Sequence, residues 1–150
     1  MTIYLRVDPA YAALLQTEAI RQAAETTLAY QKVSGPVALT VWISDDATLR
    51  RWNLRFRGVD APTDVLSFPD GEVDPDTGAR YLGDVLISYP RAAAQAAVAG
   101  HAVADELTLL VVHGVLHLLG HDHATPEEKA HMWAAQREVL RNLGCPLDPP

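Results

Sequence analysis

Apolar and polar positions alternate in several short stretches of the chain, and this pattern predicts four strands. Residues 2–7 (TIYLRV) and 37–43 (VALTVWI) alternate in the way expected of strands with one buried face. Residues 63–68 (TDVLSF) and 84–89 (DVLISY) read as two further strands. Between them, residues 69–83 are dense in Pro, Gly and Asp, which predicts a turn-rich loop.

The remaining segments show helical spacing together with residues that begin and end helices. The first predicted helix has Asp8 as its N-cap and Pro9 at its first helical position. The last has a capping box made by Thr125 and Glu128. The helix before it, residues 103–120, is apolar over most of its circumference, which is typical of a buried central helix. The five predicted helices cover residues 8–33, 44–58, 90–100, 103–120 and 125–144.

These elements predict a single α+β domain over residues 1–150, with a mixed four-stranded sheet packed with about five helices. A chain of 150 residues can bury one core, and 49% apolar with 21% charged residues excludes a disordered chain. The single cysteine, Cys145, cannot form an internal disulfide, which fits a reducing compartment. No apolar run approaches the length of about 20 residues that spans a bilayer, and the first residues lack signal-peptide features. We therefore expect a cytoplasmic protein without a membrane partner.

The net charge of −7 argues against broad affinity for nucleic acids, which requires many cationic contacts with phosphates. We expect no binding to DNA, and an RNA partner would need a local basic strip. One such strip exists in LRRWNLRFRG, where no acidic residue interrupts four arginines. The strip is either a solvated helix face or an RNA-binding surface. Its members are Arg50, Arg51, Arg55 and Arg57.

Four of the six histidines fall within the eleven residues HGVLHLLGHDH. His113 and His117 are four apart, so on a helix they share one face, separated by about 6 Å along the axis. Their rings can converge on one ion, and Gly120 can end the helix so that His123 folds back beneath them. The spacing H-x-x-x-H-x-x-G-x-x-H is the one that metzincin proteases use. It predicts a zincin-like metal site on the buried central helix.

Other interpretations of the histidines remain open. The run could consist of core or helix-end histidines without a metal. His121 could compete with His123 for the third ligand position, although a helix that ends at Gly120 favours His123. Asp122 is expected to orient a ligand or form a turn. His101 and His131 are expected to be surface or packing residues.

A site of three neutral histidines leaves a coordination position open, which is typical of catalytic zinc and not of closed structural sites. A zinc peptidase, however, carries the glutamate of H-E-x-x-H as its general base. Here that position is Gly114. The metal spacing therefore favours hydrolysis, whereas the missing carboxylate argues against peptidase chemistry.

Three ordered blocks of the sequence resemble one family. HGVLHLLGHDH resembles the signature H-G-x-L-H-L-x-G-[YH]-D-H of the YbeY family, bacterial metal-dependent endoribonucleases of ribosomal RNA maturation. Residues 53–69 (NLRFRGVDAPTDVLSFP) and 82–88 (LGDVLIS) resemble two further blocks of that family. One departure lies at FRGVDA, where the family more commonly has a basic spacer.

The resemblance implies a Zn²⁺-dependent, single-strand-specific endoribonuclease with one ion per chain. Its metal ligands fall on His113, His117 and His123, and its functionally important arginine falls on Arg57. A guanidinium there would bind the non-bridging oxygens of a phosphodiester. The attacking group is either water or the neighbouring ribose 2′-hydroxyl. In phosphoryl transfer, positioning and charge stabilisation do most of the work, which gives the absence of a carboxylate at Gly114 a possible reason.

The implied biology is maturation of the 3′ end of 16S ribosomal RNA and ribosome quality control. The implied partners are single-stranded ribosomal RNA, the small ribosomal subunit with its proteins, and an Era-type GTPase. Two rival functions remain: a metallopeptidase-like hydrolase, and a ribosome-assembly factor whose structural metal has a fourth ligand such as Cys145 or His121. Thr63, Asp64 and Asp84 either cap and orient loops or act directly in catalysis.

Overall fold

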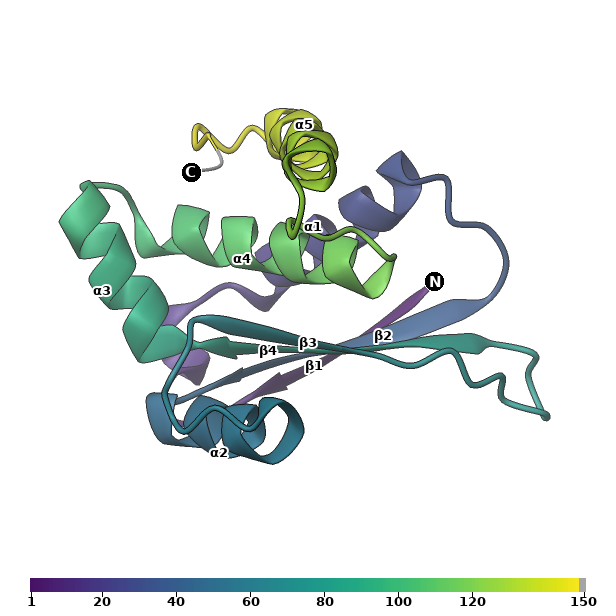
Figure 1. Cartoon of the computed structure of the whole chain (residues 1–150), viewed down its shortest axis with the longest axis horizontal. Coiled ribbons are helices and arrows are strands. Elements are labelled where there is room, and N and C mark those ends of the chain that lie inside the picture. Colours follow the sequence, from purple (N-terminus) through teal and green to yellow (C-terminus); the bar gives the residue numbers. More distant parts are fainter. Residues whose placement is uncertain (149–150) are drawn as a thin grey trace.

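The computed structural model describes residues 1–148, which form four strands, five α-helices and one short 3-10 helix (Figure 1). The strands are β1 (Thr2–Val7), β2 (Val37–Ser44), β3 (Val65–Pro69) and β4 (Arg80–Ser88). The helices are η1 (Ala12–Leu14), α1 (Thr17–Tyr30), α2 (Asp46–Arg57), α3 (Tyr89–Ala99), α4 (Val103–Leu118) and α5 (Pro126–Asn142).

The strands form one mixed sheet in the order β1-β2-β4-β3. β1, β2 and β4 run parallel, and β3 pairs antiparallel with β4 at the edge. The predicted α+β class, with a mixed four-stranded sheet and about five helices, is confirmed.

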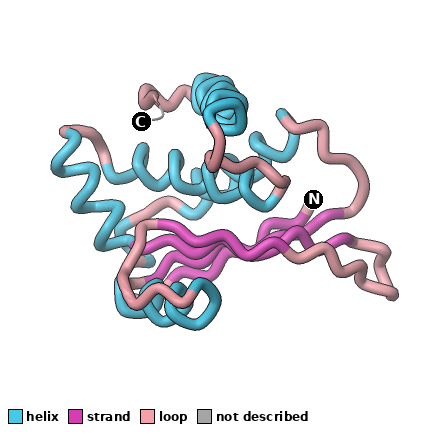
Figure 2. The backbone as a smooth tube through the Cα atoms, viewed as in Figure 1, coloured by secondary structure: helices cyan, strands magenta, loops and turns pink. Residues whose placement is uncertain are grey.

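Helices cover both faces of the sheet unequally (Figures 1 and 2). α1, α4 and α5 lie above one face, and α2 lies below the other. The main core fills the space between the sheet and the three upper helices. A smaller cluster beneath the sheet joins Leu49 of α2 to Leu66 and Leu86 of the strands. The larger core therefore holds the upper layer in place, and that layer carries the histidine run.

α4 is the central helix of the upper layer, as its apolar composition predicted. It packs against β3, β4, α1, α3 and α5, and most of its residues are buried. Within residues 1–148, no single helix is long and apolar enough to cross a membrane. α3 and α4 reach the required length and hydropathy only when joined, and a bend of 118° separates them.

The predicted start of the first helix is wrong. Asp8 does not cap a helix, because its carboxylate accepts hydrogen bonds from Trp42 Nε1 at 2.9 Å and Ser44 Oγ at 2.6 Å. The chain after β1 therefore stays bound to the end of β2. α1 begins only at Thr17.

The predicted start of the fourth strand is also wrong, since β4 begins at Arg80, inside the predicted loop. Gly83 led to the prediction of a loop in place of the start of this strand, because glycine is typical of turns. Here it has φ +135°, and a Cβ at this position would lie 2.2 Å from the carbonyl oxygen of Phe68. The glycine allows β3 and β4 to approach closely next to an irregularity in the pairing with β2.

A candidate metal centre beside a cleft

Three histidines converge where α4 ends. His113 and His117 project from the last turns of α4, and the chain then turns at Gly120, whose φ of +96° is in the left-handed region. The turn brings His123 back beside the helix. One ring nitrogen from each of the three histidines lies within 4.8 Å of the others, so the group could hold a metal ion.

The ring nitrogens of the two helical histidines have a spacing that suits a tetrahedral ion. His113 Nε2 and His117 Nε2 are 3.2 Å apart. Two ligands at about 2.0–2.1 Å from a tetrahedral zinc would be about 3.3 Å apart. Gln136 Oε1 of α5 lies 2.8 Å from His113 Nδ1, and accepting that proton leaves Nε2 with a free lone pair. The donor set therefore fits a divalent ion such as Zn²⁺.

Burial favours the neutral form of the His113 and His117 imidazoles. Desolvation lowers the pKa of His113, and the neighbouring His123 lowers it further, although the hydrogen bond with Gln136 acts in the opposite direction. Desolvation also lowers the pKa of His117, with His113 as the next contribution. Neutral imidazole is the form that binds metals, so burial favours ligation at neutral pH.

Close packing of α4 on the sheet requires glycine at position 114. A Cβ at this position would lie 2.5 Å from Val85 Cγ1 and 3.4 Å from Ser67 Oγ. The same serine hydroxyl donates a hydrogen bond to the Gly114 carbonyl oxygen at 3.0 Å. There is no room here for the glutamate of a zinc peptidase. The missing carboxylate thus has a packing reason as well as the chemical one that the sequence suggested.

A cleft of about 610 Å³ opens beside the three histidines. Arg57, the last residue of α2, lines it, and α2 ends there because Gly58 adopts a left-handed conformation with φ 70°. Ser67 of β3 and Asp64 just before that strand line it too. The cleft therefore brings the predicted arginine and the predicted metal ligands to one cavity.

The other three arginines of the basic strip do not line this cleft within residues 1–148. Arg50 forms an exposed ion pair with Asp60 at 2.6 Å. Arg51 donates to Thr48 Oγ1 at 3.2 Å. Arg55 lies over the rings of Trp52 and Phe56. Their suggested role in binding RNA stays a prediction for a surface outside the cleft.

The remaining residues of the histidine run have other partners. His121 Nε2 lies 3.0 Å from Oε1 of Gln31, the residue that follows α1, and its ring stacks on His131. Asp122 accepts a hydrogen bond from the backbone N–H of His123 at 2.7 Å, as expected of a turn residue. Outside the run, His101 Nε2 lies 2.6 Å from a carboxylate oxygen of Glu106.

The two aspartates that sequence reasoning left open lie in different places. Asp64 accepts from the backbone N–H of Val65 at 2.8 Å and lines the cleft, so it combines a loop-orienting contact with a position at the site. Asp84 accepts a short hydrogen bond from the Tyr81 hydroxyl and lines a separate cavity with Trp42.

Two residues of α5 were missed by sequence reasoning. Gln136 holds His113, and the Trp133 ring packs edge-on against His113 and His123, with centroids 6.0 and 5.6 Å apart. One signal was available: Gln136 is a polar residue at helical spacing from the buried Met132 and so falls on the apolar face of its helix.

Comparisons with known proteins agree with this geometry. A family model described as Endoribonuclease YbeY matches residues 10–144. The chain belongs to the YbeY family. The Endoribonuclease YbeY of Roseiflexus sp. (strain RS-1) is 50% identical over 149 residues, covering 95% of this chain and 93% of that protein. The YbeY of Chloroflexus aurantiacus (strain J-10-fl) is 45% identical and covers 98% of both chains.

The YbeY fold is also seen in a solved structure. The solution structure of a Thermotoga maritima protein has a TM-score of 0.63 and 25% sequence identity, covering 95% of this chain and 89% of that one. The resemblance drawn from three sequence blocks is thus confirmed over most of the chain.

Proposed function

We propose that this protein is a Zn²⁺-dependent endoribonuclease that cleaves single-stranded regions of ribosomal RNA. One observation carries the proposal: three histidine nitrogens within 4.8 Å of one another adjoin a cleft that Arg57 also lines. The names of the YbeY relatives support cleavage within RNA. The finer role is maturation of the 3′ end of 16S ribosomal RNA with ribosome quality control, in the cytoplasm, alongside small-subunit proteins and an Era-type GTPase.

In this proposal His113, His117 and His123 hold one ion per chain. Zinc bound there supplies Lewis-acid chemistry at a phosphoryl oxygen and makes water more acidic. The chain's own residues do the positioning. The Arg57 guanidinium binds the non-bridging oxygens, on which negative charge grows in the transition state. Gln136 keeps the proton of His113 on Nδ1, so that Nε2 faces the cluster.

The two rival functions fit the site less well. A peptidase needs a carboxylate at position 114, where even a Cβ would lie 2.5 Å from Val85 Cγ1. A closed structural site needs a fourth ligand, but in the described part of the chain the cluster comprises the three histidines only. Cys145 instead contacts the carbonyl oxygen of Asp105 at 3.9 Å.

The test is to purify the protein, measure its bound metal, and incubate it with a structured RNA that has single-stranded tails. Arg57→Ala should keep the metal and slow cleavage by about 10²–10³-fold, because one charge-stabilising group is lost. His117→Ala should lose both metal and cleavage. Arg141→Ala, which removes an exposed arginine paired with Glu138 on α5, is the matched control. Full cleavage by both Arg57→Ala and His117→Ala would overturn the proposal.

A further inference from the structure

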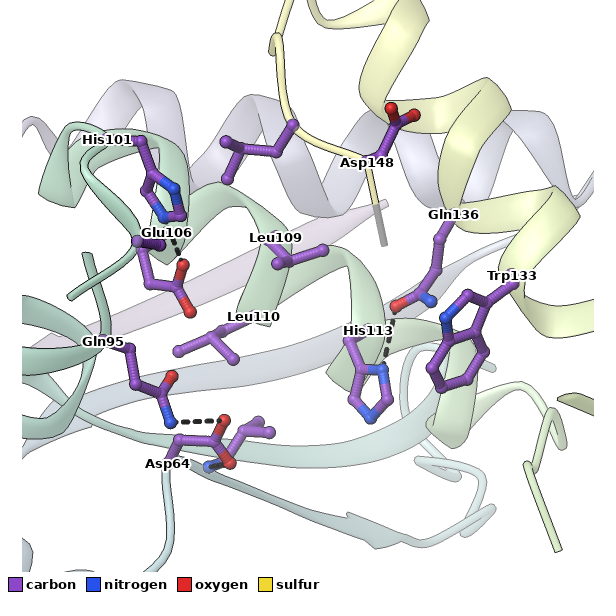
Figure 3. Close-up of a pocket in the computed structure, with 13 residues that line it drawn as sticks. Asp64, Gln95, His101, Glu106, Leu109, Leu110, His113, Trp133, Gln136 and Asp148 are labelled. Carbon is purple, nitrogen blue, oxygen red and sulfur yellow. Dashed lines mark hydrogen bonds and ion pairs between the residues drawn. The ribbon is translucent and has the colours of Figure 1, made fainter. Parts of the chain in front are cut away.

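A second cavity adjoins the cleft, and Figure 3 shows the residues that line it. Its volume is about 520 Å³, within the range of about 300–1,000 Å³ typical of small-ligand pockets. Asp64, Val65 and His113 line both cavities. A group in the second cavity would therefore lie immediately beside a phosphodiester held in the cleft.

The walls of this second cavity are largely apolar. Leu109 and Leu110 of α4 lie between Glu106 and His113 in Figure 3, and Ala99 of α3 adds to the lining. Trp133 borders it next to His113. A flat, mostly apolar group such as a nucleobase suits such walls better than a sugar or a phosphate does.

The polar groups of the cavity include one buried donor without a partner among residues 1–148, Gln136 Nε2, and several hydrogen-bond acceptors. Asp64 Oδ1 accepts the Val65 N–H at 2.8 Å, whereas Asp64 Oδ2 receives only a long contact of 3.4 Å from the Gln95 amide. The Gln95 Oε1 has no partner among residues 1–148. Glu106 is buried as a residue, with 6% exposed, and its carboxylate has His101 as a hydrogen-bond partner at 2.6 Å. Acceptors and negative charge repel a phosphate but attract N–H groups on the edge of a base.

From this complementarity we infer that the second cavity binds the base of a nucleotide flanking the scissile phosphate, and that it prefers bases with an exocyclic amino group. Adenine, cytosine and guanine present such donors, whereas uracil presents a single ring N–H between two carbonyl acceptors. The inference rests on the proposed endoribonuclease function, and it adds a base preference at one position of the RNA.

Nucleoside binding tests the pocket without any cleavage. The ¹⁵N-labelled protein is titrated with adenosine, with purine riboside, which lacks only the amino group, and with uridine. Adenosine should shift the NMR signals of the Gln95 side-chain amide and of Leu109 and Leu110. Purine riboside and uridine should bind at least about tenfold more weakly, because a hydrogen bond to a charged acceptor is lost.

Two variants of adjacent residues on α3 form a matched pair for this test. Ala99→Phe places a ring in the cavity and should abolish the adenosine-induced shifts. Val98→Phe adds the same ring at a neighbouring side chain that is 91% exposed and outside the lining, and it should bind like the parent. Equal binding of adenosine and purine riboside, or unchanged binding by Ala99→Phe, would overturn the inference.

Cleavage then separates this inference from the function on which it rests. RNAs that differ only at the nucleotides flanking the cut should be cleaved at different rates by the parent, and Ala99→Phe should lose that difference. Cleavage without base preference and without nucleoside binding overturns the base pocket alone. Nucleoside binding without cleavage overturns the proposed function, and with it the assignment of the bound base to a substrate.

Discussion

Gly114 offers the sharpest test of how α4 is seated on the sheet. Replacing a helical glycine by alanine ordinarily stabilises a protein by up to about 1 kcal/mol, because alanine has the higher helix propensity. At Gly114 the added Cβ would lie 2.5 Å from Val85 Cγ1 and 3.2 Å from its Cγ2. The nearer contact is about 1 Å shorter than an optimal carbon–carbon contact.

Val85 has little freedom to relieve this contact, since it is 0% exposed and β4 is flanked by β2 and β3. Overpacking of this kind costs about 1–3 kcal/mol. After a gain in helix propensity of about 1 kcal/mol, Gly114→Ala should lower the free energy of unfolding by up to about 2 kcal/mol. For a chain of this length, that lowers Tm by up to about 8 °C.

Urea unfolding of a double-mutant cycle with Val85→Ala checks the reasoning. Val85→Ala alone removes two buried methyl groups and should cost about 2 kcal/mol. In the double variant the new alanine methyl fills the space that the valine leaves. The two changes should therefore couple favourably by at least about 1 kcal/mol. Additive losses, or a single Gly114→Ala variant more stable than the parent, would refute the packing explanation.

Three further predictions concern a metal contact, a helix cap and a loop anchor. Gln136→Leu should weaken zinc binding about 10–100-fold in a competition assay, because His113 loses the acceptor that orients it; unchanged affinity would contradict this role. Asp45→Ala removes the α2 cap on the Thr48 N–H and should cost about 1 kcal/mol at pH 7. That cap's hydrogen bonds lower the pKa of the Asp45 carboxyl, so the stabilisation is present above the unfolded pKa and disappears as pH falls through the folded one. If urea unfolding shows that the loss in Asp45→Ala does not depend on pH, this explanation is wrong. Asp8→Ala leaves two donors of β2 without their acceptor and should cost about 1–3 kcal/mol by the same assay, whereas a neutral effect would show that the anchor is dispensable.

The local part of the fold could be predicted because short-range rules govern it. Spacing within one helix sufficed to bring His113 and His117 together, and one glycine sufficed to return His123. The errors arose where a distant partner decides the structure. Asp8 has the sequence context of a helix cap, yet its carboxylate accepts hydrogen bonds from two donors on β2. Gly83 has the sequence context of a turn, yet it lies within β4, where the absence of a side chain allows β3 to approach closely.

The candidate site could be predicted only in part for the same reason. The three histidines that could hold a metal lie close in sequence, whereas the other members of the site come from distant elements. Arg57 was found through the family resemblance, because no spacing rule relates the end of α2 to the end of α4. Gln136 was missed because its role depends on how α5 packs over His113. The second cavity is bounded by α3, α4, α5 and β3 and has no local sequence signal.

Two of the three histidines lie on a buried helix and the third lies in an exposed turn, so the two parts of the site should differ in how readily they open. His113 and His117 belong to α4, whose amide protons should exchange with solvent only when the whole domain unfolds. His123 is exposed and lies in the connection before α5, which can open at much lower cost. An ion bound by all three would tie this connection to the slowest-exchanging element of the fold. Its release should then speed exchange in residues 119–125 while α4 stays protected, so that gain and loss of the ion would order and loosen one wall of the cleft.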